Sequence, residues 1–151
     1  MQTNSIFQGV FFCVLLLIAS YTDIKKREIP DTICMLIAFT GLLNFSFVNL
    51  LGLTVALPFL IAAMLKENSI GGGDIKLTAA LGISFGYWNG IYGLILSLTL
   101  ILLFYVVLKL ILRIRKKQVL KNLSMPLAPF LGIGFITIYF ITLGGKVYEL
   151  F

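Results

Sequence analysis

Long apolar runs recur along the whole chain and leave little room for charge: 60% of the residues are hydrophobic and 12% are charged. Inside a bilayer only helices and closed β-barrels satisfy their backbone hydrogen bonds, and a helix needs about 20 apolar residues to cross the hydrocarbon core. The runs are continuous rather than alternating in polarity, which favours helices. The sequence therefore predicts an all-α, polytopic membrane protein in which residues 1–151 form a single membrane-embedded domain.

The apolar runs predict about six transmembrane helices. Their approximate bounds are residues 6–21, 32–47, 50–65, 74–85, 91–112 and 125–148. Residues 86–90 interrupt the apolar pattern, and their aromatic side chains suit the membrane interface. No basic side chain precedes the first run, which argues against a cleaved signal peptide. We therefore expect the first run to be retained as a span.

Positive charge gathers on one side of this arrangement. If the connections after the first, third and fifth spans share a side, that side holds eleven basic residues, and the other side holds only Lys146. The eleven are Lys25, Lys26, Arg27, Lys66, Lys76, Lys109, Arg113, Arg115, Lys116, Lys117 and Lys121. Basic loops stay in the cytoplasm. We therefore expect a multi-pass protein of the cell (plasma or inner) membrane, with both termini outside. The basic loop at 113–121 is interpreted as a topology signal in contact with membrane lipids, not as a nucleic-acid site.

The segment Gly71-Gly72-Gly73-Asp74-Ile75-Lys76 places a carboxylate and an amine between two apolar runs. Ionisable groups are costly in membrane segments, so their first interpretation is functional. The glycines would let another backbone approach Asp74 and would permit backbone angles closed to other residues. Helix capping is the alternative role for Asp74. Lys76 is expected to bind a lipid or a substrate carboxylate, or to extend to the interface.

Asp23 is the natural partner of Asp74, because it ends the first span on the side where Asp74 begins the fourth. Two carboxyl groups at one depth suit aspartic-protease chemistry, in which one is ionised and the other protonated. Asp74 would be the ionised base at a helix N-terminus, and Asp23 the protonated partner at a helix C-terminus. Asp31 is the competing third acid and follows Pro30, which favours a helix-capping role.

Metal and cofactor chemistry are not expected. The chain has no histidine, which excludes a histidine base and the commonest transition-metal sites. Cys13 and Cys34 lie in apolar runs without a C-x-x-C spacing, so we expect buried free thiols and no structural zinc.

The motif Gly71-x-Gly73-Asp74-x-Lys76 resembles that of the GxGD membrane aspartic proteases of the type IV prepilin peptidase family, which includes the archaeal preflagellin peptidases. The motif is accompanied by Asp23, by Ile29-Pro30-Asp31 and by the late segment Met125-Pro126-Leu127-Ala128-Pro129-Phe130. The resemblance covers nearly the whole chain and implies Asp23 and Asp74 as the catalytic pair.

The implied activity is endopeptidase cleavage, at the cytoplasmic membrane face, of the short basic leader of prepilin-like or preflagellin-like precursors in type IV pilus or protein-secretion systems. No loop has the paired cysteines of the methylating bacterial members, so the likeness is to the short, protease-only form and methylation is not expected. The basic cytoplasmic loops do not attract a basic leader, so its recognition requires another part of the chain.

Two other functions fit an acidic membrane helix. One is a small ion- or proton-coupled transporter, since intramembrane carboxylates also mark ion paths. Transporter sites lie near the bilayer midplane at broken helices of internal repeats, whereas the acids here lie at one edge and no repeat is evident. The other is a scaffold in which Asp74 is only a helix cap.

Overall fold

The computed structural model describes residues 2–42, 47–65, 70–114 and 125–148, and every regular element in these ranges is helical. This confirms the all-α prediction. In chain order the elements are α1 (Gln2–Lys26), α2 (Asp31–Leu42), α3 (Phe47–Leu50), the 3-10 helix η1 (Leu51–Ala56), α4 (Leu57–Leu65), α5 (Gly72–Phe85), α6 (Tyr87–Ile114) and α7 (Ala128–Tyr148). Because α3, η1 and α4 follow one another without a break, they form one irregular rod, and the described chain consists of six rods.

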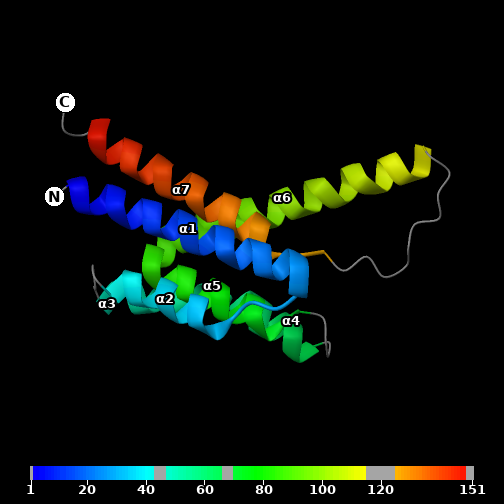
Figure 1. The fold of residues 1–151 in the computed structure, drawn as a ribbon, viewed down its shortest axis with the longest axis horizontal. Coiled ribbons are helices and arrows are strands. Elements are labelled where there is room, and N and C mark those ends of the chain that lie inside the picture. Colours follow the sequence, from blue (N-terminus) through cyan, green and yellow to red (C-terminus); the bar gives the residue numbers. More distant parts are fainter. Residues whose placement is uncertain (1, 43–46, 66–69, 115–124, 149–151) are drawn as a thin grey trace.

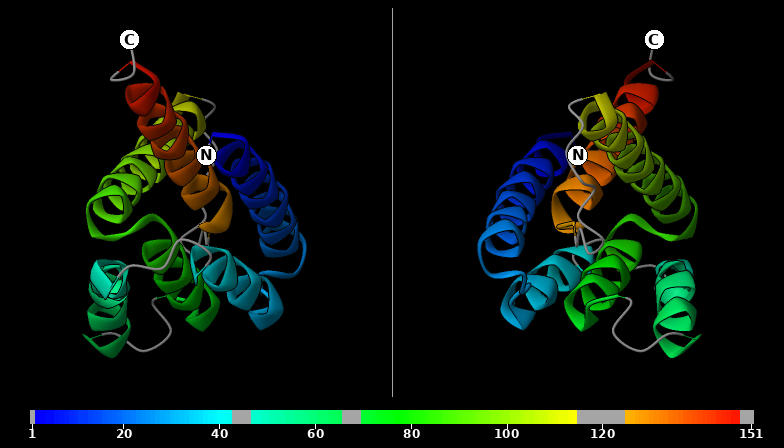
Figure 2. Two further views of the ribbon diagram at one scale, coloured as in Figure 1. Left: turned by 90° about the vertical axis from the view of Figure 1, so that its left-hand side faces the viewer. Right: turned by 90° about the vertical axis from the view of Figure 1, so that its right-hand side faces the viewer.

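The rods form two layers of three (Figures 1 and 2). One layer contains α1, α6 and α7, and the other contains α2, α5 and the rod of α3, η1 and α4. The start of α1 and the end of α7 lie at the same end of the molecule, whereas α1, α4 and α6 all finish toward the opposite end (Figure 1). The three connections that follow α1, α4 and α6 therefore leave from one end.

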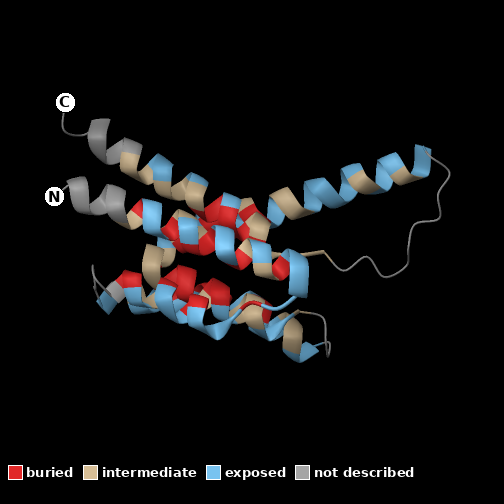
Figure 3. Cartoon of the chain, in the orientation of Figure 1, coloured by how far each residue is buried: buried red, intermediate tan, exposed pale blue. Residues whose placement is uncertain are grey.

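Buried residues gather where the two layers meet (Figure 3), and most of them are apolar. Leu16 of α1, Ile37 of α2, Leu77 of α5 and Phe135 of α7 are essentially inaccessible. Many large apolar side chains point outward instead, above all on the half of α6 that projects beyond the other helices (Figure 1). Outward apolar surface of this extent is what a lipid environment requires.

Among the described residues, two helices are long and apolar enough to cross a membrane, Gln8–Lys26 and Tyr87–Ile114. The apolar helical stretches Asp31–Gly41, Leu51–Leu65 and Ala128–Leu143 are shorter. The 12 residues of α2 extend about 18 Å at 1.5 Å per residue, against about 30 Å of hydrocarbon. The six-span topology therefore rests on the arrangement of the rods and the charges, and it is treated below as a proposal.

The first helix is longer than predicted. It continues past residue 21 to Lys26, because the charged turn after the apolar run is also helical. Lys25 and Lys26 lie in this last turn, where positive charge complements the helix dipole. The Arg27 N–H still donates to the Asp23 carbonyl oxygen at 2.9 Å, but Arg27 has a left-handed φ of 56°, which ends the helix.

Two other predicted boundaries differ from the structure. The interruption expected at 86–90 is confined to Gly86, whose φ of 77° and ψ of 173° suit only glycine, and α6 begins at the next residue. The third rod begins at Phe47 rather than at residue 50 and includes a 3-10 segment. The second helix ends at Leu42, and residues 43–46 of the expected break lie outside the described residues.

Glycines bring η1 and α5 into backbone contact. A Cβ placed on Gly82 would collide with the carbonyl oxygen of Gly52, and a Cβ on Gly52 would collide with that of Gly82. Backbone atoms cannot move aside as a flexible side chain can, so neither position accepts a larger residue without separating the two elements. This contact fixes α5, which carries Asp74, against the third rod.

We expect Gly82→Ala to lower the free energy of unfolding by about 1–3 kcal/mol, the usual cost of overpacking. Gly132→Ala in α7 is the matched control, because its Cβ would lie at ordinary contact distances of 3.6 Å from Ser20 Oγ and 3.7 Å from Leu16 Cβ. Alanine is a better helix former than glycine, so the control should be neutral or stabilising. Thermal unfolding in lipid nanodiscs compares the two, and equal stabilities would contradict the close contact.

Candidate active site

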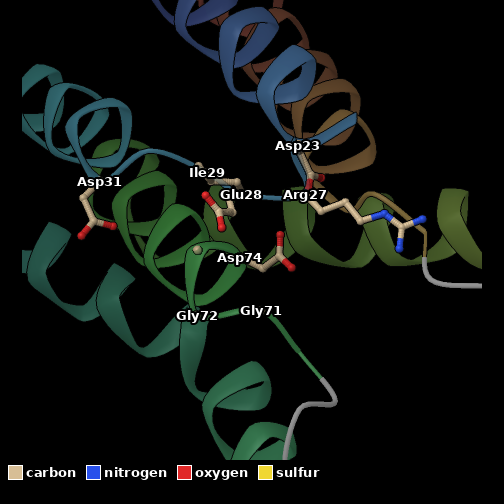
Figure 4. Close-up of a pocket in the computed structure, with 9 residues that line it drawn as sticks. Asp23, Arg27, Glu28, Ile29, Asp31, Gly71, Gly72 and Asp74 are labelled. Carbon is tan, nitrogen blue, oxygen red and sulfur yellow. The ribbon is translucent and has the colours of Figure 1, made fainter. Parts of the chain in front are cut away.

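A pocket of about 270 Å³ opens where the α1–α2 connection meets the start of α5 (Figure 4). Four of the six acidic residues of the chain line it, in a protein whose net charge is +6. The lining residues are Asp23, Arg27, Glu28, Ile29, Asp31, Gly71, Gly72, Gly73 and Asp74. Negative charge is therefore concentrated at one place in an otherwise basic chain.

Asp23 lies in the last turn of α1 and is 7% exposed. Its Oδ2 accepts a hydrogen bond from the backbone N–H of Ala128 at 2.9 Å. Ala128 is the first residue of α7 and is completely buried. The first N–H groups of a helix have no acceptor inside the helix, so the Asp23 carboxylate caps α7 from a different helix.

The sequence around Ala128 explains why its N–H needs an outside acceptor. Pro129 follows it and has no N–H, and the N–H groups of Phe130 and Leu131 both donate to the Leu127 carbonyl oxygen, at 3.1 and 3.0 Å. Sequence reasoning used this segment for the family resemblance and did not identify the bond to Asp23. Pro129 indicates that a helix starts here, but the local sequence does not reveal which residue accepts the hydrogen bond from the Ala128 N–H.

Asp74 is the third residue of α5, and its side chain is partly buried. The N-cap of this helix is Gly71, which has no side chain, and the Asp74 N–H donates to the Gly71 carbonyl oxygen at 3.1 Å. Within the described part of the chain, Asp74 Oδ1 is buried and has no hydrogen-bond partner. A buried polar atom without a partner is costly, which favours a functional role over simple capping.

The glycines beside Asp74 serve close approach rather than unusual backbone angles. Among the described glycines only Gly86 has a positive φ, so that part of the expectation was wrong. A Cβ on Gly73 would lie 3.1 Å from Ile29 Cβ, whereas a Cβ on Gly72 would meet no described atom within 4 Å. Gly73 therefore lets the α1–α2 connection lie against α5, and Gly72 leaves the pocket wall without a side chain.

The structure brings Asp23 and Asp74 together from different layers, and both carboxyl groups face the pocket (Figure 4). They are close enough to interact electrostatically. The bond from Ala128 at the positive end of α7 stabilises a charge on Asp23, while the unpartnered Oδ1 of Asp74 offers no such stabilisation. Asp23 thus has a donor that would stabilise a charge and Asp74 Oδ1 has none, whereas the sequence interpretation had placed the charge on Asp74.

The other predicted residues lie around this pair. Asp31 is the first residue of α2, and both of its carboxylate oxygens accept hydrogen bonds from Lys76. Lys76 thus binds a residue of its own chain, which the sequence interpretation did not consider. Arg27 and Glu28 also line the pocket and were not singled out; their place in the short connection after Asp23 was the available signal.

The capping role of Asp23 can be tested by stability. Asp23→Ala leaves the Ala128 N–H buried without a partner, which should lower the free energy of unfolding by about 1–3 kcal/mol. Asp23→Asn retains an oxygen that can accept the bond and should cost less. Thermal unfolding and hydrogen exchange at the Ala128 amide measure both effects. Equal protection of that amide in wild type and Asp23→Ala would show that the bond is not formed.

A sequence profile of the type IV leader peptidase family matches residues 10–108, which include the whole pocket. Prepilin peptidase EppA of Methanococcus maripaludis is 34% identical over 77 residues, which are 50% of this chain and 22% of that protein. EppA of Methanocaldococcus jannaschii is 36% identical over 78 residues, which are 50% of this chain and 23% of that protein. The prepilin leader peptidase/N-methyltransferase of Bacillus subtilis is 31% identical over 144 residues, 89% of this chain and 55% of that protein.

The chain thus spans about half or less of the length of these curated relatives. No solved structure gives a significant match. The family profile nevertheless covers well over half of the chain and contains all three aspartates of the pocket, Asp23, Asp31 and Asp74. The chain belongs to the type IV leader peptidase family.

Proposed function

We propose that the protein is a membrane aspartic endopeptidase that removes the short basic leader of prepilin-like or preflagellin-like precursors. The observation that carries the proposal is the pocket shared by Asp23 of α1 and Asp74 of α5. Membership of the family and the peptidase activity of its named relatives support the same activity.

In the proposed mechanism Asp23 is the general base and Asp74 the general acid. Asp23 takes a proton from water as the water oxygen attacks the scissile carbonyl carbon, and Asp74 donates its proton to the carbonyl oxygen. The leaving nitrogen then takes the proton held by Asp23 as the C–N bond of the tetrahedral intermediate breaks. One hydroxyl of the intermediate returns its proton to Asp74 as the new carboxyl group forms, which restores both side chains. Water and two carboxyl groups supply all of this chemistry, so the mechanism uses no cofactor and no metal ion.

The proposed topology has six transmembrane rods with both termini outside. The start of α1 and the end of α7 share one end of the molecule, and the pocket lies toward the other end (Figures 1 and 4). The last turns of α1 and α6, which finish toward that end, carry Lys25, Lys26 and Arg113, and this favours the cytoplasmic face of the cell membrane. A precursor whose leader is cytoplasmic and whose apolar helix lies in the bilayer would present its cleavage site at this depth.

The basic loops cannot attract a basic leader, but the carboxylates that line the pocket can. Glu28 is exposed and is the carboxylate in the lining that belongs neither to the proposed catalytic pair nor to the Lys76 ion pair. A positively charged leader side chain beside Glu28 would be attracted without disturbing the catalytic carboxyl groups. We therefore assign leader binding to Glu28.

The transporter alternative receives less support. Transporter sites lie near the middle of the bilayer at interrupted helices. The proposed pair instead belongs to the last turn of α1 and the first turn of α5, at the ends of two helices. The proposed function is therefore the peptidase activity, without transport or methylation.

Replacing either catalytic carboxyl group should abolish cleavage. Asp23→Asn and Asp74→Asn keep the shape of the side chain but remove the ionisable proton, so the rate of leader removal should fall roughly 10²- to 10⁴-fold. The measurement is cleavage of a pilin-like precursor co-expressed with each variant. Glu149→Gln makes the same chemical change at the far end of the chain and should leave cleavage unchanged. Full activity of either aspartate variant would exclude the pair.

Glu28→Gln should raise KM for a basic leader about two- to fivefold, the value of an exposed ion pair, and leave kcat unchanged. A precursor in which the leader lysines and arginines are replaced by glutamine is the matched substrate. Wild type and Glu28→Gln should cleave it equally well, and high salt should reduce the difference on the basic leader. An equal KM difference on both substrates would rule out charge recognition by Glu28.

A further inference from the structure

Lys76 of α5 joins Asp31 of α2 in an ion pair beside the pocket. Its Nζ donates to both carboxylate oxygens, at 2.8 and 2.7 Å, although the residues are 45 positions apart. Both side chains are more than half exposed, at 57% for Lys76 and 66% for Asp31. The mechanism proposed above assigns no role to either residue.

The direction of Lys76 separates it from the proposed catalytic pair. Two residues along a helix correspond to about 200° of rotation, so Lys76 and Asp74 point to different sides of α5. Lys76 therefore neutralises Asp31, a pocket carboxylate, and does not hold Asp74 in its charged form. This leaves Asp74 free to carry the proton that the mechanism requires.

The ion pair lies next to a tight contact between the α1–α2 connection and α5. Ile29 is 8% exposed, and a Cβ on Gly73 would lie 3.1 Å from its Cβ and 3.4 Å from its backbone nitrogen. Asp31 follows Ile29 by two residues, and Lys76 follows Gly73 by three. Packing and the ion pair thus attach the connection to the same part of α5 at adjacent points.

The attachment of the α1–α2 connection to α5 affects the distance between Asp23 and Asp74, the proposed catalytic residues. Asp23 belongs to one layer and Asp74 to the other, and only the residues 27–30 separate α1 from α2. A connection this short transmits a shift of the start of α2 directly to the last turn of α1. We infer that Asp31 and Lys76 are positioning residues, whose ion pair sets the separation of Asp23 and Asp74. This inference rests on the proposed function.

An exposed ion pair contributes little to folding, whereas catalysis is sensitive to small displacements. Asp31→Asn and Lys76→Gln should therefore each lower kcat at least tenfold, with KM changed less than about twofold and the thermal midpoint unchanged. The double variant should be no worse than either single one, because the same ion pair is lost. Lys76→Arg retains a two-point contact with the carboxylate and should keep most of the wild-type kcat.

The experiment measures kcat, KM and thermal unfolding of the purified full chain in nanodiscs with a synthetic pilin-like precursor. Wild-type kcat in both single variants would overturn the inference. So would losses that multiply in the double variant, since these would mean separate roles, or losses that match a fall in thermal stability. If wild type itself does not cleave the precursor while remaining folded, the proposed function fails instead.

Discussion

The hydrogen bond from the Ala128 N–H to Asp23 connects the fold to its chemistry. A carboxyl group that is 7% exposed in an apolar protein needs a hydrogen-bond partner, and the N–H at the start of α7 provides one. The same bond supplies the acceptor that α7 lacks inside its own first turn. The start of α7 and the last turn of α1 therefore depend on each other, and the position of Asp23 is set by two helices rather than one.

Asp74 is held by the opposite means. Two contacts fix the helix that carries Asp74. Gly82 contacts the backbone of Gly52 in η1, and the Gly73 position lies against Ile29 of the α1–α2 connection. Neither contact touches the Asp74 side chain, whose Oδ1 remains without a partner in the described structure. Rigid packing around an unsatisfied carboxyl group suits a residue that must bind water or substrate rather than stabilise the protein.

Sequence reasoning reached the helical class, the number of rods and part of the pocket lining, including Asp23 and Asp74, because apolar periodicity and isolated charges in membrane segments are local signals. It missed what depends on contacts between distant residues. Nothing near Asp23 identifies Ala128 as its partner, 105 positions away, and nothing near Lys76 identifies Asp31. The proposed mechanism reverses the sequence-based protonation assignment for this reason. The C-terminal end of α1 disfavours a charge on Asp23, whereas the N–H of Ala128 at the start of α7 favours one.

The proposed peptidase has two requirements that conflict: positive loops to orient the chain in the membrane, and negative charge to bind a basic leader. The chain places these charges in different parts of the structure. Positive residues in the connections orient a chain, yet they repel a positive substrate. Placing four of six carboxylates around one pocket answers this conflict, because screening confines the repulsion of the loops to about 8–10 Å while the pocket acts at contact. Lys76 fits the same scheme. By pairing with Asp31 outside the proposed catalytic pair, it lowers the total negative charge of the pocket. In the proposed function this leaves Glu28 for the leader and one proton for Asp23 and Asp74 to share.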